Sequence, residues 1–403
     1  MNTNDDKNET NEIQPISARL LAPVTGALLK DPPDIPDERI LKALAHLLWS
    51  DGRIHESLTC LALLEEREEL KPPELQLKGY WQLYSGDVEG ARKTFAAALK
   101  QDNTRHPTSR LGYAYALFHS KDYASAEDVF QRLANEGSSL RSPALMAAAS
   151  RAMSSGELPK EVPIAPVPGL PPGMSNVLQT KILSGYEGAL QQAHAHLTSL
   201  PASEQLPLQR LMVELYLNSG QDQEAVALVD KLVASYENDG SLLVLKGMAL
   251  RGIGKREESH ESFLLSTFIA PLDSRGWAGY AAGCLEGGAF DKATKAYRIA
   301  VFLDGNNPSY WGDLGISESE LKNYSQGRSA ISKSIELGLH NFTNYFNRGV
   351  CSLYLNEFTD ALNDWQMAIT IEPQNPRAAE AEKLIQNTSG PPVDNRFVFG
   401  DVP

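Results

Sequence analysis

The sequence predicts an all-α fold, a solenoid of tandem helix-turn-helix repeats, and three observations lead to this fold class. The same pattern recurs without a gap in blocks that begin at Leu206, Gly240, Ser274, Pro308 and Phe342. Within each block, apolar residues recur at helical spacing on both sides of a short turn. A small residue also returns at one fixed position of every second helix. A regular period of this kind is typical of stacked helix pairs that each contact only their neighbours.

The block 274–307 illustrates the unit. Its first helix carries Trp277, a Gly-Gly turn follows, and its second helix carries Ala293 and Tyr297. This pattern indicates two amphipathic helices joined by a tight turn. In the last block Pro373 marks the end of the second helix, because proline cannot continue a helix.

Further units precede these blocks at 38–71, 72–105, 107–140 and 170–203, so that nine complete units result. The recurring residue of the second helix is never large. A bulky side chain there would force the two helices apart at a cost of about 1 to 3 kcal/mol. The nine small residues are Ser57, Ala91, Ala126, Ala189, Ala225, Ser259, Ala293, Gly327 and Ala361.

These residues resemble the tetratricopeptide repeat family, in which helix A carries Trp, Leu, Gly and Tyr, and helix B carries Ala, an aromatic residue, Ala and Pro. The resemblance covers most of the chain. It implies a right-handed superhelix of about nine repeats plus capping helices, with a concave face that binds a protein or peptide. Within the family, the segment 277–315 looks like the translocator chaperones of bacterial type III secretion, which are smaller and hold hydrophobic secreted subunits.

Segments outside the repeats suggest the domain organisation. Residues 156–173 contain six prolines, a density that favours an extended, semi-rigid spacer. A lone helix at about 141–155 resembles half a repeat, and such a helix commonly caps a stack. The expected organisation is a disordered or partly helical N-terminal arm at 1–37, an N-terminal array with its cap at 38–155, a Pro-rich linker at 156–169, a C-terminal array with its cap at 170–388 and a disordered tail at 389–403.

Two terminal stretches contain apolar residues with no place in a repeat. Ile16 to Leu29 predicts a short helix, broken at Pro23, that either docks on a partner, mediates self-association or packs on the first repeat. In the tail, Arg396, Phe397 and Phe399 form a partner motif, fold back into the groove or do neither. A self-assembling structural scaffold that uses these tails is the alternative to a scaffold that binds a different protein.

Composition excludes several function classes. The chain has 403 residues, a formal net charge of -14 and a pI of about 5.1, and it has no basic stripe that could hold nucleic acid. Cys60, Cys284 and Cys351 stand singly and match no disulfide or metal spacing. The segment 1–15 is polar, unlike a signal peptide, and no apolar run approaches membrane-spanning length. We expect a cytoplasmic protein without membrane insertion; its oligomeric state stays open.

No catalytic, metal or cofactor site can be read from the sequence. Gly252, Gly254 and Lys255 differ from a phosphate-binding loop in spacing, and they lie in a turn between two helices. His194 and His196 are two residues apart, which places them on different faces of a helix. We therefore expect no enzyme activity, no metal and no cofactor.

The family resemblance implies a partner-binding groove lined by five positions of each helix A. A basic residue paired with Asn, as in family members that clamp a C-terminal carboxylate, is absent: the first repeat has Lys42 with His46 at those positions. Apolar extended or helical peptides are then the better ligands, and an acidic rim would favour basic flanks. The finer expectation is a chaperone or adaptor, including one for a secretion system. Each groove residue could instead pack between neighbouring helices A. The predicted groove residues are Tyr80, Leu83, Tyr84, Tyr115, Phe118, Met146, Met153, Leu178 and Ile182.

Overall fold

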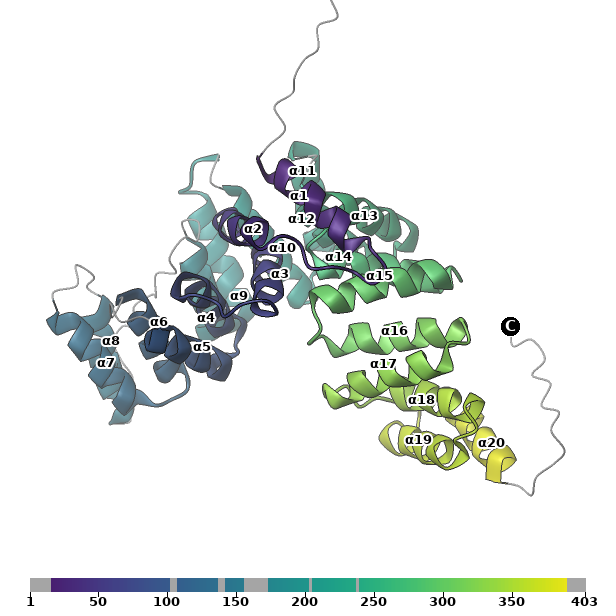
Figure 1. The fold of residues 1–403 in the computed structure, drawn as a ribbon. Coiled ribbons are helices and arrows are strands. Elements are labelled where there is room, and N and C mark those ends of the chain that lie inside the picture. The colour runs from purple at the N-terminus through teal and green to yellow at the C-terminus, as the bar shows by residue number, and fades with distance from the viewer. Residues whose placement is uncertain are drawn as a thin grey trace, which may run out of the picture. The chain divides into compact units, whose positions relative to one another are not determined.

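The computed structural model describes residues 16–101, 107–136, 142–155, 173–202, 205–236 and 239–389. The regular secondary structure in these ranges is helical, α-helical except for a 3-10 residue at Ala202, and the helices pair in antiparallel fashion (Figure 1), which confirms the predicted fold class. The chain forms two compact units that divide between Asp273 and Ser274. Unit 1 and unit 2 are described separately below.

Unit 1 holds thirteen labelled helices within its described residues, and the pairs fall on the predicted repeats. In each pair, helix A comes first and helix B follows a short turn. The helices are α1 (Ile16–Leu28), α2 (Glu38–Ser50), α3 (Ile54–Glu65), α4 (Pro72–Ser85), α5 (Val88–Gln101), α6 (Pro107–His119), α7 (Tyr123–Asn135), α8 (Ser142–Ser154), α9 (Met174–Leu197), α10 (Gln205–Asn218), α11 (Asp222–Ser235), α12 (Gly240–Gly252) and α13 (Arg256–Ile269).

Unit 2 contains three helix pairs and a final single helix in its described part. The pairs begin at Ser274, Pro308 and Phe342, the block starts that the sequence predicts. The helices are α14 (Ser274–Glu286), α15 (Phe290–Leu303), α16 (Pro308–Glu320), α17 (Tyr324–Glu336), α18 (Phe342–Tyr354), α19 (Phe358–Ile371) and α20 (Ala378–Ser389).

The turn between helix A and helix B needs one residue in the left-handed backbone region. Glycine fills this fifteenth position of the repeat in several units, for example Gly254 with φ of 80° and Gly288 with φ of 73°. In other units the residue is Lys121, Lys322 or Asn356, with φ between 63° and 67°. The common conformation keeps the same tight turn in units whose sequences differ.

A small residue of helix A opposite a large residue of helix B forms the centre of each repeat. A Cβ atom added at Gly349 would lie 2.6 Å from the indole nitrogen of Trp365, and one at Gly247 would lie 2.8 Å from the Phe263 ring. The small position of helix B also tolerates serine, because the Ser259 hydroxyl donates to the Gly247 carbonyl at 2.7 Å. Close helix packing therefore explains the recurring small residues.

Within each unit, helices A lie on the inner side of the stack. Helices A of neighbouring repeats contact one another: α4 contacts α6, α10 contacts α12, α14 contacts α16, and α16 contacts α18. In the described part of the chain, no comparable contact joins helices B of neighbouring repeats. The helices A are thus closer together, and their exposed sides form the concave face.

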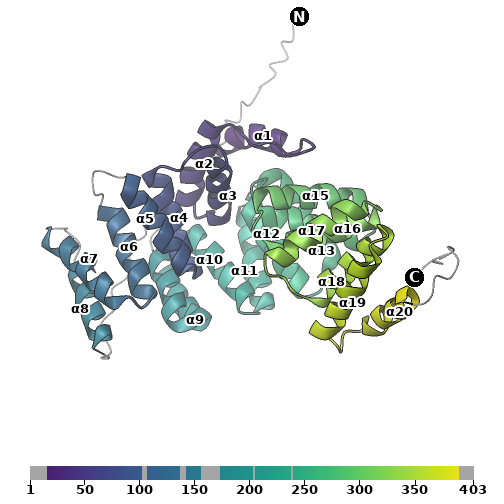
Figure 2. The same cartoon turned by 60° about the horizontal axis from the view of Figure 1, so that its bottom comes forward.

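The repeat predicted at 170–203 departs from the others. Gly185, with φ of 74° and ψ of -170°, divides α9 into two helices without a separate turn. α9 packs on α10 and also reaches α4 of the N-terminal repeats. In Figure 2, α5 to α8 extend from α9 in one direction and α11 to α13 in the other.

The predicted domain boundaries differ from the observed units. One apolar core contains Trp49 and Tyr80 of the predicted N-terminal array together with Val177 and Leu211 of the C-terminal one. The compact units divide inside the predicted range 170–388, and the linker 156–169 lies outside the described residues. Whether the two predicted arrays fold as separate domains stays a prediction.

Three single helices pack beside the helix pairs. α8 packs on α7, and α20 packs on α19 with Ala381 buried. α1 contacts α2 and buries Val24 and Leu28, which supports its packing on the first repeat. The predicted break at Pro23 is wrong, because α1 continues through that residue. Proline removes only one helical N–H there, and the Pro23 side chain is exposed.

Candidate protein-binding surface

The structure places most of the predicted groove residues in the core of unit 1. Met153 is only half-buried, and the side chains of Tyr84 and Ile182 lie outside the described residues. The six buried residues are Tyr80, Leu83, Tyr115, Phe118, Met146 and Leu178. Their contact with a partner stays a prediction, and it would require this core to open.

The aromatic residues among them turn toward their own and the following repeat. The Tyr80 ring meets Phe95 edge-on at 5.0 Å between ring centroids, and its hydroxyl donates to the Thr108 carbonyl at 3.0 Å. Tyr115 meets Phe130 in the same way at 5.2 Å. These side chains fill the space between neighbouring helices, which is the alternative that the sequence leaves open.

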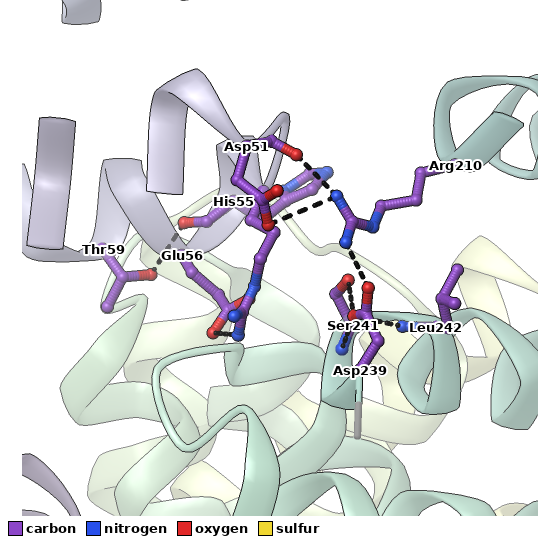
Figure 3. A network of polar contacts seen from close by, with 9 residues as sticks. Asp51, His55, Glu56, Thr59, Arg210, Asp239, Ser241 and Leu242 are labelled. Atoms are coloured by element: carbon purple, nitrogen blue, oxygen red, sulfur yellow. Dashed lines mark hydrogen bonds and ion pairs between the residues drawn. The ribbon is translucent and has the colours of Figure 1, made fainter. Parts of the chain in front are cut away.

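A polar junction fastens the first repeat of unit 1 to α10 (Figure 3). Arg210 donates to the backbone carbonyl of Asp51 at 2.5 Å and forms an ion pair with Asp239. Asp239 in turn accepts from the backbone nitrogen of Ser241 at 3.0 Å and caps α12. The arginine side chain is only 6% exposed, so these contacts are shielded from solvent.

A second buried pair lies beside this junction. Arg53 donates to both carboxylate oxygens of Glu56 at 2.6 Å. Burial raises the pKa of Glu56, although Arg53 acts against that effect. Burial also opposes the charge of Asp239, but Arg210 and the Ser241 hydroxyl more than offset it and lower the pKa of Asp239. These carboxylates are committed to packing, which makes them poor candidates for catalysis.

Unit 2 offers an apolar surface that is accessible. At the family's ninth and twelfth positions, helices α14, α16 and α18 present partly exposed apolar side chains on the concave face. We call this set the inner strip; it consists of Ala282, Leu285, Ile316, Val350 and Leu353. The signal for it is present in the sequence, because the same register rule applied to the later repeats selects these residues.

Acidic and hydroxyl side chains border the inner strip. Glu286 and Glu320 are exposed at the ends of α14 and α16, while Ser309 and Thr343 are exposed at the starts of α16 and α18. The helices that carry the strip are held by an ion pair between Arg298 and Glu318, at 2.8 Å. Within the last repeat, Arg348 of α18 pairs with Asp364 of α19 at 2.6 Å.

An aromatic cluster lies at the turn end of the last repeats. The rings of Tyr324 and Tyr354 stack at 4.3 Å with an interplanar angle of 4°. Phe358, one repeat after Tyr324, is 49% exposed. Sequence reasoning missed this cluster, although the equivalent repeat positions of Tyr324 and Phe358 were the available signal.

The described residues contain no group of three or more His, Cys, Asp or Glu side chains that could hold a metal ion. Cys60, Cys284 and Cys351 are buried and unpaired with one another. Among the helices of the described ranges, none is long and apolar enough to cross a membrane.

Residues 78–139 match the family model described as tetratricopeptide repeat, a range that contains α5, α6, α7 and most of α4. This part of the chain therefore consists of tetratricopeptide repeats, a motif typical of protein-interaction scaffolds. No curated protein matches the chain.

Several solved structures of tetratricopeptide repeat proteins are similar to parts of this chain. The Arabidopsis OM64 TPR domain is 26% identical, with 28% of this chain and 94% of that domain covered and a TM-score of 0.27. YrrB, described as a TPR protein with an unusual peptide-binding site, is 16% identical, with 44% and 91% covered and a TM-score of 0.39. The Cut9-Hcn1 structure is 14% identical, with 87% and 77% covered and a TM-score of 0.39. The likeness to secretion chaperones gains no support from these proteins.

Proposed function

We propose that this chain is a non-catalytic scaffold whose inner strip in unit 2 binds an apolar segment of a partner protein. The observation that carries the proposal is the half-buried state of Ile316, Val350 and Leu353 on the concave face. Partly exposed apolar side chains that lie together on a concave surface are typical of protein-binding sites. The buried groove residues of unit 1 offer no comparable area, so the proposal rests on unit 2.

The spacing of the strip favours an extended peptide. The strip residues come from successive helices A, so a ligand that crosses these helices would meet an apolar position on each one. A ligand with apolar side chains at intervals would bury them there, and its backbone would remain free for polar contacts with Ser309 and Thr343. Chaperone or adaptor activity, including a role in secretion, would be one use of such a site.

Charge sets the expected specificity. Glu286 and Glu320 border the strip, and the whole chain carries a net charge of -14. Basic residues that flank the apolar segment would be attracted to this rim and would speed association at low salt. An acidic flank would be repelled, which excludes many competing peptides.

Photo-crosslinking in living cells tests the proposal. A crosslinking amino acid at Ile316 should capture a partner protein, and the same residue at Met367, which is 45% exposed on α19, serves as the matched control. We expect a partner that is captured from position 316 and not from position 367. Equal capture from both positions, or none from 316 and Val350, would contradict the inner strip as the binding site.

Substitutions in the inner strip test whether the captured partner needs these residues for binding. Ile316→Glu together with Val350→Glu should abolish recovery of the captured partner, whereas Met367→Glu should leave it unchanged. Far-ultraviolet circular dichroism checks that all variants remain helical. A double variant that is fully helical and still binds the partner would place the site elsewhere.

A further inference from the structure

The exposed aromatic ring of Phe358 is best understood from the repeat register. Phe290, Tyr324 and Phe358 begin helix B in three successive repeats and occupy the same repeat position. One repeat later, helix A ends with the residue that can cover this position. For Tyr324 the covering residue is Tyr354, whose ring stacks on it at 4.3 Å. For Phe290 the residue at that position is Glu320, so among these three rings the stack gives an aromatic cover to Tyr324.

Phe358 has no such cover in the described part of the chain. The helix that follows it, α20, packs on α19 in place of another helix A. The end of α20 consists of Asn387, Thr388 and Ser389, which have small polar side chains and no ring. Phe358 consequently stays 49% exposed, although it opens a helix in the last repeat of the array.

The chain continues from a point near this ring. α20 follows α19 after a short loop and packs on it, so the chain turns back along α19 toward the end that carries Phe358. Fourteen residues, 390–403, follow α20 and lie outside the described ranges. Phe397 is eight residues beyond Ser389, a length that spans up to about 26 to 29 Å when extended. This reach exceeds the length of α19, about 21 Å for its 14 residues.

Within the tail, which also carries Asp394 and Asp401, the charge that favours docking is that of Arg396 beside the aromatic residues. Glu357 and Asp360, on either side of Phe358, both pair with Arg328, which leaves one net negative charge next to the ring. In the tail, Arg396 directly precedes Phe397. A tail that places Phe397 on the Phe358 ring would bring this arginine close to the acidic pair.

We propose that the C-terminal tail of this chain docks intramolecularly on Phe358 and supplies, through Phe397, the aromatic cover that Tyr354 gives to Tyr324. The tail thus completes the end of the repeat array. A ring pair of this kind contributes beyond the area that it buries, and tethering avoids the entropy loss of association. The inference is independent of the inner strip and of its partner.

Hydrogen exchange of the whole chain provides the first test. The amides of 355–362 should exchange more slowly in the wild type than in a Phe397→Ala/Phe399→Ala variant or in a chain that ends at Ser389. Residues 312–319 of α16 serve as the internal reference and should not change. Equal exchange of 355–362 in all three chains would overturn the proposal.

A binding experiment in trans identifies the surface. A labelled peptide of residues 390–403 should bind the chain that ends at Ser389 and should bind the full chain more weakly, because the tethered tail competes. Phe358→Ala in the shortened chain should weaken binding by about tenfold, the size expected for one aromatic contact and its buried area. Met367→Ala should leave binding unchanged, since Met367 lies on another face of α19.

Three results would contradict intramolecular docking on this ring. Equal peptide binding by the Phe358→Ala chain would place the tail elsewhere, and absence of binding together with unchanged exchange would exclude docking altogether. Protection that rises with protein concentration, accompanied by a dimer mass in light scattering, would assign the tail to a second copy of the chain.

Discussion

The concave faces of the two units use the same repeat positions for different purposes. In the second and third repeats of unit 1 the ninth position of helix A holds Tyr80 and Tyr115, which turn into the core and are at most 1% exposed. In unit 2 the ninth position holds Ile316 and Val350, which remain partly exposed. A large aromatic residue reaches the neighbouring repeat and closes the face, whereas a short aliphatic one leaves it open. The repeat position of a residue therefore does not by itself predict whether it lines a groove. The length of its side chain and its contacts with the adjoining repeat also decide this.

The largest expected effect comes from the closed face. Tyr115→Ala should lower the free energy of unfolding by about 3 to 5 kcal/mol, because it removes a fully buried ring and leaves a cavity. Denaturant unfolding, followed by circular dichroism, measures the change. A loss below about 1 kcal/mol would mean that the ring is not part of a tight core, and the contrast between the units would fail.

The second largest effect is expected at the Arg210 junction, which is a feature of unit 1. Arg210→Ala leaves Asp239 buried without its cation, and breaking a buried pair in this way costs about 3 kcal/mol or more. The matched control is Arg348→Ala in unit 2, whose partner Asp364 is also shielded but does not join distant repeats. Limited proteolysis should detect opening near Asp51 only in the Arg210 variant. Identical cleavage patterns would show that the junction does not hold these repeats together.

A smaller effect is expected on the open face. Ile316→Ala should cost about 1 kcal/mol or less, since part of the side chain already contacts water. The same variant should weaken partner binding more than it lowers stability. If its unfolding loss equals that of Tyr115→Ala, the inner strip is core and not a binding surface.

The smallest effect is expected in how the free energy of unfolding changes at acid pH. The pKa of Asp239 is lowered: burial opposes the charge, but Arg210 and Ser241 prevail. Because its folded pKa lies below the unfolded one, the carboxylate stabilises the folded chain above about pH 4, and this contribution is lost as the pH falls through the folded pKa. The free energy of unfolding should therefore fall less steeply with acid in Asp239→Asn than in the wild type. The raised pKa of Glu56 changes the pH dependence of stability in the opposite direction. The contribution of Asp239 is therefore obtained from the difference between the wild-type and Asp239→Asn stability curves.

The repeat register of the sequence predicts where the helices lie, but it does not predict the contacts between helices of different repeats. The repeat period placed α14 to α19 correctly, because each small residue of helix B must face its own helix A. The left-handed turns at Lys121 and Lys322 were not predictable, since lysine carries no signal for that conformation.

Contacts between distant repeats were equally hidden from the sequence. The burial of Tyr80 depends on the start of the next repeat, where the Thr108 carbonyl accepts its hydroxyl. The junction at Arg210 depends on how α10 returns to the first repeat after a long intervening segment. A family rule based on position within one helix contains neither kind of information.

The contact of Arg210 with the first repeat also bears on the order in which the chain can pack during its synthesis. The hydrogen bond to the Asp51 carbonyl joins residues 159 positions apart. At a synthesis rate of about 5 to 20 residues per second, Asp51 is synthesised roughly 8 to 32 s before Arg210. Throughout that interval Trp49 and Ile54, which end up in the shared core with Leu211, await part of their packing. The nascent chain should accordingly be most open to chaperones at its N-terminal end, and only until α10 has been translated.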